Sequence, residues 1–374
     1  MTANGISWEW PFRCTNCSQP YPTLGFPFCC DNCGGVYDFK DPVSFDPVQR
    51  TRPGRQSIDR YRRSFPLPVD VDLVSLGEGD TPLLPHRIFS REIFFKCEHL
   101  NPTGSFKDRG TAVLVSALIA AGIKKAVEDS SGNAGASLAA YAARAGIQVR
   151  IFVPEFASGP KRMQIDAFGA QVVQIPGPRS ATAEAVRREA ERGIAYASHA
   201  YQPHGIAGMT TIAFEIAEQL QGSPGTVITP VGQGTLLLGL HRGFQALQSA
   251  GVIDRIPALV GVQARACAPL WAAFSGDASD LHSASEGETV AEGVRIIQPL
   301  RADAILHAIG DSGGKIVAVD EEKILKGRDA LARIGLYVEP TSALVVPALE
   351  DVLDACLDPI VLVLTGSGFK ALGG

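Results

Sequence analysis

The chain has 374 residues, of which 45% are hydrophobic and 20% are charged, with 39 Gly and 25 Pro. This composition predicts a soluble globular protein of two or three domains and excludes a disordered chain or a fibre. The net charge of −5 argues against a nucleic acid partner. No apolar run is long enough to cross a membrane and no secretory signal opens the chain, so we expect a cytoplasmic protein.

Cysteines are concentrated near the start of the chain, where five of the eight lie between positions 14 and 33. Two C-x2-C pairs, Cys14 with Cys17 and Cys30 with Cys33, have the spacing of a tetrahedral Zn²⁺ site. Four protein ligands leave no position for a substrate, so the metal would be structural. Cys29 adjoins Cys30 and could take its place, and two disulfides are the alternative to a metal.

A connector rich in Pro and Arg, Asp41 to Pro68, follows the cysteines, and beyond it short β-branched runs alternate with amphipathic stretches. The runs predict strands at 149–153, 171–175, 227–229, 258–262, 316–319 and 360–364. The stretches predict helices at 136–145, 181–192, 236–247 and 321–334. Strands separated by helices indicate an α/β fold of parallel sheets flanked by helices. Ligands of such folds bind at the carboxyl ends of the strands.

Lys107 lies in the segment Asn101-Pro-Thr-Gly-Ser-Phe-Lys107-Asp-Arg-Gly110, where a turn precedes a long apolar stretch. We expect the lysine at the start of a helix, near the positive end of the helix dipole. That position suits an amine that is neutral and nucleophilic towards an aldehyde. A surface lysine near a helix start is the alternative for this segment taken alone.

Three further turns rich in small residues follow in the chain. Ser130-Ser-Gly-Asn133-Ala-Gly lies between a strand and a helix, where backbone N–H groups suit a carboxylate or phosphate. Thr229-Pro-Val-Gly232-Gln-Gly234-Thr-Leu is a candidate phosphate cradle, although a tight turn would look the same. Thr365-Gly-Ser-Gly-Phe-Lys370 closes the last predicted strand and brings hydroxyl groups that could face a ring nitrogen.

These four motifs, in this order over about residues 75 to 374, resemble the fold type II pyridoxal-phosphate (PLP) enzymes, and threonine synthase and its relatives most of all. The resemblance implies two PLP-enzyme domains preceded by a small zinc-ribbon-like module with four cysteines. The implied division is a ribbon over 1–45, a linker and the first part of the large domain over 46–115, a small domain over 116–205 and the rest of the large domain over 206–374. It also implies a homodimer and a small amino-acid substrate.

The resemblance assigns roles by position. Lys107 would bind PLP covalently and shuttle protons, and Asn133 would hydrogen-bond the cofactor's 3′-oxygen. The amides of Ser131, Gly132, Asn133 and Ala134 would receive the substrate carboxylate. Thr365 would face the ring nitrogen as a neutral hydroxyl, which favours elimination and replacement over transamination. The cofactor phosphate would be surrounded by Gly232, Gln233, Gly234, Thr235 and Leu236.

The sequence departs from threonine synthases at polar positions near the substrate, among them the position of the arginine that holds the substrate phosphate. Gly205 stands at the position of their arginine and Ala207 at that of an acidic residue, Ser367 replaces a histidine, and Ala134 replaces a threonine. His204 is adjacent, but a neutral imidazole is a poor substitute for a guanidinium.

Three functions therefore stay open. The first is a threonine synthase-like lyase acting on an activated homoserine or serine, and the second is a β-replacement synthase or a serine/threonine ammonia-lyase. The third is a zinc-ribbon binding protein whose enzyme-like body has lost its activity, which the presence of Lys107 and Asn133 opposes.

Overall fold

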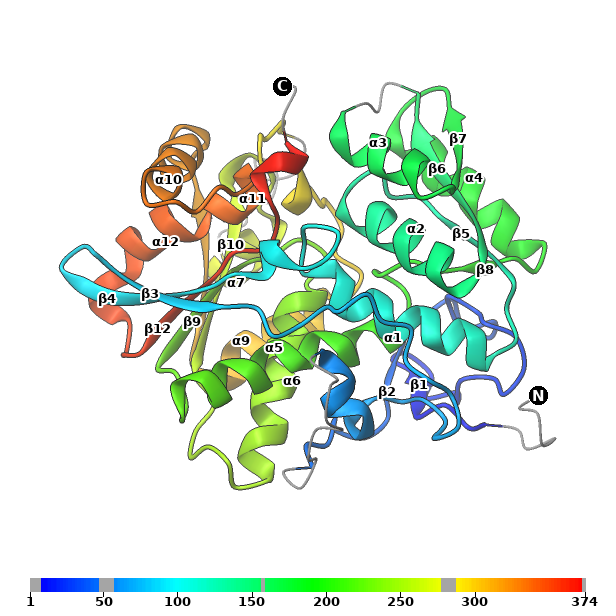
Figure 1. Cartoon of the computed structure of the whole chain (residues 1–374), viewed down its shortest axis with the longest axis horizontal. Coiled ribbons are helices and arrows are strands. Elements are labelled where there is room, and N and C mark those ends of the chain that lie inside the picture. The colour runs from blue at the N-terminus through cyan, green and yellow to red at the C-terminus, as the bar shows by residue number, and fades with distance from the viewer. Residues whose placement is uncertain (1–7, 47–56, 156–158, 277–286, 372–374) are drawn as a thin grey trace. The chain divides into compact units, whose positions relative to one another are not determined.

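The computed structural model describes residues 8–46, 57–155, 159–276 and 287–371. Contacts divide the chain into two compact units, Met1–Gly79 with Lys107–Gly208 and Asp80–Phe106 with Met209–Leu372 (Figure 1). Part of the predicted connector, residues 47–56, lies outside the described residues. No helix among the described residues is long and apolar enough to cross a membrane.

The first unit is built on a four-stranded parallel sheet in the order β7-β6-β5-β8. Its strands are β5 (Lys125–Glu128), β6 (Gln148–Pro154), β7 (Gln171–Ile175) and β8 (Ala195–Tyr196). Its helices are α1 (Lys107–Ala120), α2 (Asn133–Ala145), α3 (Pro160–Ala167) and α4 (Arg179–Glu191). Val186 of α4 packs on the sheet against Val127, Phe152 and Tyr196. The helix α2 ends at Gly146, whose φ of +67° is the left-handed cap that glycine adopts without strain.

The cysteine segment belongs to the same unit. It forms an antiparallel pair, β1 (Phe12–Cys14) with β2 (Tyr37–Phe39), in which Phe12 faces Phe39. A 3-10 helix, η1 (Ile58–Ser64), follows it in the chain.

The second unit is built on a six-stranded sheet in the order β11-β10-β9-β12-β4-β3, in which only the edge strand β3 is antiparallel. Its strands are β3 (Leu83–Ile88), β4 (Arg91–Lys96), β9 (Thr226–Pro230), β10 (Ala258–Ala264), β11 (Lys315–Val319) and β12 (Ile360–Val363). The central strand β9 is buried along its whole length, as a parallel strand covered on both faces should be.

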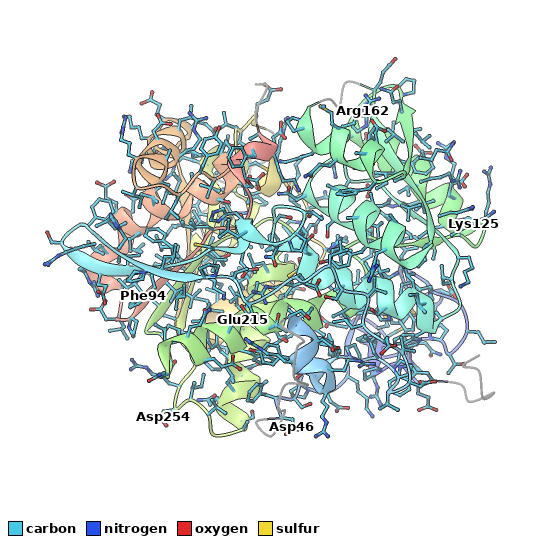
Figure 2. The ribbon with its side chains drawn as sticks, viewed as in Figure 1. Asp46, Phe94, Lys125, Arg162, Glu215 and Asp254 are labelled. Atoms are coloured by element: carbon cyan, nitrogen blue, oxygen red, sulfur yellow. The ribbon has the colours of Figure 1, made fainter. Side chains whose placement is uncertain are left out.

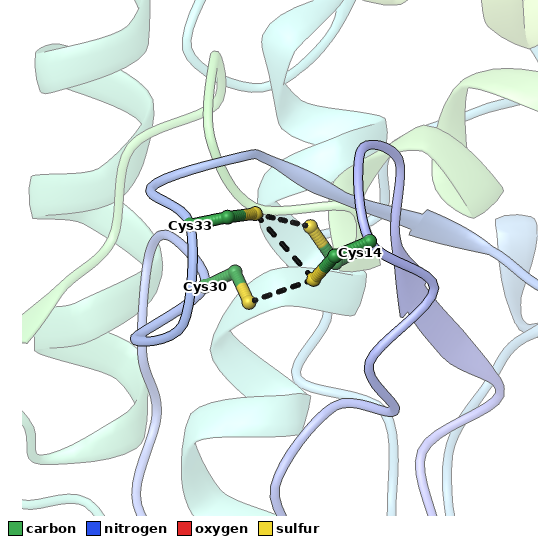
Figure 3. Close-up of side chains that lie close together, drawn as sticks. Cys14, Cys30 and Cys33 are labelled. Atoms are coloured by element: carbon green, nitrogen blue, oxygen red, sulfur yellow. Dashed lines mark hydrogen bonds between the residues drawn. The ribbon is translucent and has the colours of Figure 1, made fainter.

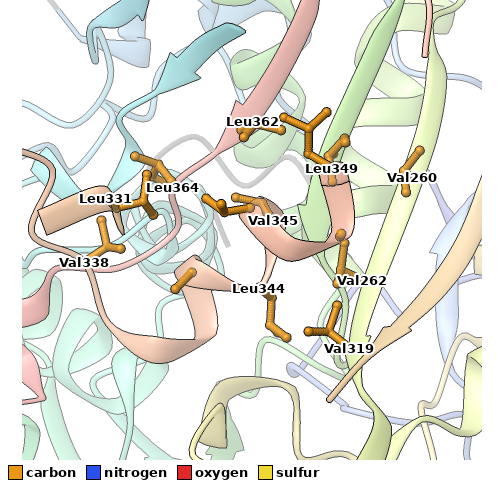
Figure 4. Close-up of a cluster of buried hydrophobic side chains, with 14 of the residues drawn as sticks. Val260, Val262, Val319, Leu331, Val338, Leu344, Val345, Leu349, Leu362 and Leu364 are labelled. Atoms are coloured by element: carbon orange, nitrogen blue, oxygen red, sulfur yellow. The ribbon is translucent and has the colours of Figure 1, made fainter. Parts of the chain in front are cut away.

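Helices of the second unit pack their apolar sides on this sheet. They are α6 (Thr235–Ser249), α7 (Pro269–Ser275), α9 (Ala302–Asp311), α10 (Glu321–Arg333), α11 (Pro340–Ala343) and α12 (Val345–Val352). The helix α5 (His204–Leu220) begins in the first unit and continues in the second. Short 3-10 turns complete the path: η2 (Glu98–Leu100), η3 (Arg265–Cys267), η4 (Glu292–Val294), η5 (Leu353–Ala355) and η6 (Gly368–Lys370). Figure 4 shows part of the core, with Val260 and Val262 of β10 near Leu344, Val345 and Leu349.

A buried ion pair joins β4 to α5 within the second unit. The Lys96 ammonium donates to Glu215 Oε2 at 2.6 Å, and the two side chains are 0% and 1% exposed (Glu215 is labelled in Figure 2). Lys96 also donates to the carbonyl of Thr81 and to Gln219 Oε1. These bonds satisfy a charge that burial alone would make very unfavourable.

The predicted α/β class with parallel sheets is confirmed, and every predicted strand and helix corresponds to an observed one. The interval 171–175 coincides with β7, and α2 begins three residues before the predicted 136. The hairpin of β3 and β4 was not predicted.

Candidate functional site

Lys107 is the first residue of α1, as the sequence predicted, and its side chain is half-buried. Gly104 precedes it with a φ of +83°, a conformation that turns the chain sharply before the helix. The following residues of α1 are buried from Asp108 to Leu118. Lys107 is therefore held at the N-terminus of a buried helix, where the dipole disfavours the charged ammonium.

A buried hydrogen-bond network fixes the first turn of α1. Ser137 Oγ on α2 lies 2.7 Å from Asp108 Oδ1 and 2.7 Å from Thr111 Oγ1. Thr111 Oγ1 in turn lies 2.9 Å from His199 Nε2 and donates to the Lys107 carbonyl at 2.9 Å. Burial, and then the charge of Lys107, lower the pKa of His199 to about 3, so the imidazole is neutral at physiological pH. The sequence offered no partner for His199.

The asparagine loop connects β5 to α2 at the carboxyl edge of the four-stranded sheet. Ser131, Gly132, Asn133 and Ala134 are all half-buried, and the Gly132 N–H donates to Ser130 Oγ at 3.2 Å. A Cβ at Gly135 would lie 1.9 Å from the Ser130 carbonyl oxygen, so the loop folds back on α2 more closely than any other residue would permit. No described residue accepts a hydrogen bond from the N–H of Ser131 or Ala134. These amides can receive a carboxylate.

Two carboxyl groups precede the asparagine loop. Tyr196 donates its hydroxyl to Asp129 Oδ1 at 2.6 Å. Burial, and then the charge of Asp129, raise the pKa of the Glu128 carboxyl well above its ordinary value, while the charges of Lys107 and Arg179 oppose the shift. Neither acid was predicted as a site residue, although charged residues at the end of an apolar strand are a recognisable signal.

In the second unit, the turn after β9 leads into α6. Gly234 has a φ of +80°, and a Cβ at Gly232 would lie 2.9 Å from the Gly293 carbonyl oxygen. Gln233 Oε1 accepts from the Leu300 N–H at 3.2 Å. No described residue accepts a hydrogen bond from the backbone N–H groups of residues 232–237, most of which are buried. Buried donors at the start of a helix require an acceptor, and a phosphate group satisfies them.

Thr365 follows the neighbouring strand β12 at the same carboxyl edge of the six-stranded sheet. Its side chain is 2% exposed, and its hydroxyl lies 2.9 Å from Ser342 Oγ. The Thr365 carbonyl accepts from the Phe106 N–H at 3.0 Å, and Lys107 is the next residue in the chain. The structure thus supplies buried amides and a buried hydroxyl, which fit the phosphate and ring of PLP.

The positions that differ from threonine synthases are tightly packed. A Cβ at Gly205 would lie 3.3 Å from the Gly110 carbonyl oxygen, and one at Gly208 would lie 2.0 Å from the Arg109 carbonyl oxygen. The start of α5 therefore packs closely against the backbone of α1 at positions 205 and 208. Ser367 Oγ accepts from the Phe369 N–H at 3.3 Å and caps the N-terminus of η6.

His204 contacts aromatic side chains of the segment that contains β1, β2 and the four cysteines, called the ribbon below, and does not face a polar pocket. Its ring centroid lies 4.6 Å from those of Trp10, Phe12 and Phe26, and it is stacked on Phe26. The side chain is fully buried, and no described residue hydrogen-bonds either ring nitrogen. Burial lowers the pKa of His204 to about 3. A neutral ring enclosed by aromatic side chains cannot bind a phosphate.

The four cysteines of the two C-x2-C pairs come together in the ribbon (Figure 3). Their sulfur atoms all lie within 4.8 Å of one another, with Cys14–Cys33 and Cys17–Cys33 at 3.4 Å and Cys17–Cys30 at 3.6 Å. A zinc tetrahedron with bonds of about 2.3 Å places its sulfurs about 3.8 Å apart. Cys29 lies outside the cluster, and burial raises the pKa of its thiol.

Comparisons with known proteins agree with this geometry. The family model of the pyridoxal-phosphate dependent enzymes matches residues 74–366. The threonine synthase of Methanocaldococcus jannaschii is 35% identical, and the match covers 96% of this chain and 92% of that protein. The threonine synthase of Mycobacterium tuberculosis is 34% identical, with coverage of 88% and 92%.

Solved structures show the same fold. A threonine deaminase from T.th. superposes with a TM-score of 0.64 at 29% identity, over 77% of this chain and 92% of that one. An O-ureido-L-serine synthase superposes with a TM-score of 0.65 at 20% identity, over 79% and 92%.

Two parallel sheets, with glycine-rich turns at their carboxyl edges and a lysine at a helix start, define a PLP enzyme of fold type II. The chain belongs to the pyridoxal-phosphate dependent enzymes. Within that family it is a threonine synthase-like lyase, which confirms the predicted enzyme class.

Proposed function

We propose that Lys107 is the residue that holds PLP and moves the proton at the substrate's α-carbon during elimination or replacement at the side chain. The position of Lys107 at the start of a buried helix, in a chain of this family, carries the proposal. PLP, when bound, supplies an electron sink for the carbanion that forms at the α-carbon. The network from Asp108 through Ser137 and Thr111 holds the helix turn that bears the amine.

The other site residues have distinct tasks in this proposal. The amides of Ser131, Gly132 and Ala134, with Asn133, bind the substrate carboxylate, and the Asn133 side chain also hydrogen-bonds the cofactor's 3′-oxygen. The unbonded amides at the start of α6 support phosphate binding there. Those amides belong to Gly232, Gln233, Gly234, Thr235 and Leu236. The Thr365 hydroxyl faces the ring nitrogen.

The substrate we propose is a small amino acid whose leaving group is not a phosphate. Gly205 packs against the α1 backbone, and His204 is neutral and enclosed, so neither replaces the arginine that grips phosphohomoserine in threonine synthases. Loss of one charge-assisted hydrogen bond costs about 1.5–3 kcal/mol. The second candidate is a β-replacement synthase or a serine/threonine ammonia-lyase. Gly205 and His204 favour it because neither provides a contact for a substrate phosphate.

A product screen separates these functions. The holoenzyme would be given O-phosphohomoserine, O-acetylhomoserine, O-acetylserine, serine and threonine, and threonine, keto acid and ammonia would be quantified. Turnover of a substrate without phosphate supports the proposal, and keto acid from serine or threonine selects the ammonia-lyase. Threonine formed from O-phosphohomoserine alone would contradict the proposed substrate class.

We further propose that Cys14, Cys17, Cys30 and Cys33 bind a structural Zn²⁺. The short distances between the four sulfurs support this proposal, and all four thiols are free of disulfides. The aromatic contacts of His204 would join this ribbon to the start of α5.

We also propose that the domains are divided at residues 45, 115 and 205. We further propose a cytoplasmic location and a homodimer. The eight free cysteines support a reducing compartment. Light scattering on the holoenzyme would give twice the chain mass of 39.6 kDa for the dimer.

A further inference from the structure

Residues 196–208, which we call the linking segment, run from the end of β8 through the connection to α5 and into the first turn of α5. The linking segment, the ribbon and α1 all belong to the first unit. The residues of the linking segment are buried, apart from Ala200 and Tyr201, which are half-buried. A buried stretch of chain is close-packed on its surroundings, so it cannot shift without displacing the groups that it contacts.

The linking segment contacts the ribbon through aromatic rings and a hydrogen bond. The His204 ring is enclosed by the three aromatic rings described above. Gln202 Nε2 donates to the Pro27 carbonyl at 3.3 Å. The Tyr201 ring meets Phe28 edge to face, with the two ring centroids 5.1 Å apart. The ribbon therefore holds the linking segment at three positions close together in the sequence.

These contacts lie beside the proposed zinc ligands. Phe12, which packs on His204, precedes Cys14 by two residues. Phe28 precedes Cys30 by the same interval. Cys14 and Cys30 are the two buried members of the four-cysteine cluster. Because metal binding orders the residues that carry the ligands, zinc would fix the aromatic rings against which the linking segment packs.

The linking segment also contacts the start of α1, the helix that begins with Lys107. A Cβ at Gly208 would lie 2.0 Å from the Arg109 carbonyl oxygen, so the two backbones meet without a side chain between them. His199 Nε2 lies 2.9 Å from Thr111 Oγ1, and Thr111 donates to the Lys107 carbonyl at 2.9 Å. A displacement of the linking segment would therefore move the helix turn that bears the Lys107 amine.

We propose that the zinc-bound ribbon positions Lys107 through the linking segment, with His204 as the positioning residue, so that zinc and PLP strengthen each other's binding. This inference rests on the proposed function, in which Lys107 holds PLP and the four cysteines hold zinc. A ligand that orders one end of a packed network lowers the ordering cost for a ligand at the other end. Such coupling is reciprocal: each ligand changes the affinity for the other by the same factor.

Thermodynamic linkage in the full-length wild-type protein tests the inference. The PLP dissociation constant would be measured by visible absorbance with zinc bound and after zinc is removed with a chelator. The zinc dissociation constant would be measured by competition, with and without PLP. We expect each ligand to tighten the binding of the other by the same factor, between about 5- and 150-fold. Affinities that do not depend on the second ligand, or a chain that binds no zinc, would overturn the inference.

Hydrogen exchange in the PLP-free protein separates positioning of the helix from binding of the cofactor. Amide exchange would be compared by mass spectrometry with and without zinc. We expect zinc to slow exchange in the linking segment and in the first turns of α1, and to leave β10 and β11 of the second unit unchanged. Slowing confined to the ribbon would contradict the inference. A chain that binds no PLP would remove the proposed function, and the exchange data would still decide whether the ribbon orders α1.

Substitutions assign the coupling to His204. His204→Ala leaves a cavity among the aromatic rings, so it should reduce the zinc-dependent change in PLP affinity to less than about twofold while zinc stays bound. His204→Phe keeps an aromatic ring and should retain the full factor. If His204→Ala does not fold, His204→Leu replaces it, because leucine fills more of the cavity.

Leu118→Ala is the matched control. It removes a fully buried side chain near the other end of α1, so it should lower stability and leave the zinc-dependent factor unchanged. Wild-type coupling in His204→Ala, or an equal loss of coupling in Leu118→Ala, would show that His204 does not transmit the effect of zinc.

Discussion

Replacement of His204 by phenylalanine should remove a pH-dependent loss of stability. The imidazole is buried among Trp10, Phe12 and Phe26, with both nitrogens unbonded among the described residues. Leaving buried polar groups unbonded costs about 1–3 kcal/mol. Phenylalanine preserves an aromatic ring in the cluster, so we expect the variant to be at least as stable as wild type at pH 7.5.

The magnitude at lower pH follows from the histidine's pKa. Burial lowers this pKa from 6.5 to about 3, so below pH 6.5 the unfolded chain binds a proton that the folded chain does not. The stability that His204 contributes is present above pH 6.5 and is lost as the pH falls towards 3. At about 1.4 kcal/mol per pH unit, the loss reaches roughly 2 kcal/mol at pH 5.

Urea unfolding at pH 7.5 and pH 5 would measure this difference. Tryptophan fluorescence is a suitable probe because Trp10 lies 4.6 Å from His204. The difference in free energy of unfolding between His204→Phe and wild type should increase by about 2 kcal/mol in favour of the variant from pH 7.5 to pH 5. A change in cysteine protonation between the two pH values would alter the free energy of unfolding of both proteins equally, so it cancels in the difference between them. His86→Phe, at an exposed histidine on β3, is the matched control. An advantage of the same size at both pH values would refute the reasoning.

Three further changes test other parts of the structure. Glu215→Ala removes the carboxylate partner of the buried Lys96 ammonium and should cost about 3–5 kcal/mol in free energy of unfolding, whereas replacing both residues with apolar side chains should cost much less. Gly135→Ala places a Cβ against a backbone carbonyl oxygen at 1.9 Å, so it should displace the asparagine loop and raise KM in steady-state assays. An unchanged KM would show that the loop does not bind substrate. Cys17→Ser should abolish stoichiometric zinc by elemental analysis and lower the thermal midpoint, whereas Cys29→Ser should change neither; zinc retained in both variants would contradict the proposed ligands.

Local sequence patterns predicted several strands and turns that the structure shows. The β-branched run at 227–229 predicted β9, because a strand buried on both faces needs such side chains. Gly104 and Gly234 lie in turns with a positive φ, and Gly135 lies in the first turn of α2, close to the Ser130 carbonyl oxygen. A glycine in the sequence is enough to suggest a positive φ or a close backbone approach at its position.

Side-chain partners from distant parts of the chain could not be predicted. Ser342 and Thr365 are separated by 23 residues, and His204 meets aromatic rings almost two hundred residues earlier in the chain. Lys96 was missed because a charged residue argues against a buried position until Glu215 is known to face it. These contacts are set by tertiary packing, which no local pattern encodes.

The most direct test of the account is the identity of the lysine that carries PLP. The holoenzyme would be reduced with borohydride and digested, and the modified peptide would be sequenced by mass spectrometry. We expect the cofactor's mass on Lys107 in stoichiometric yield, and no modified peptide from Lys107→Ala. Stoichiometric modification of another lysine, or unchanged labelling of the Lys107→Ala enzyme, would contradict the account.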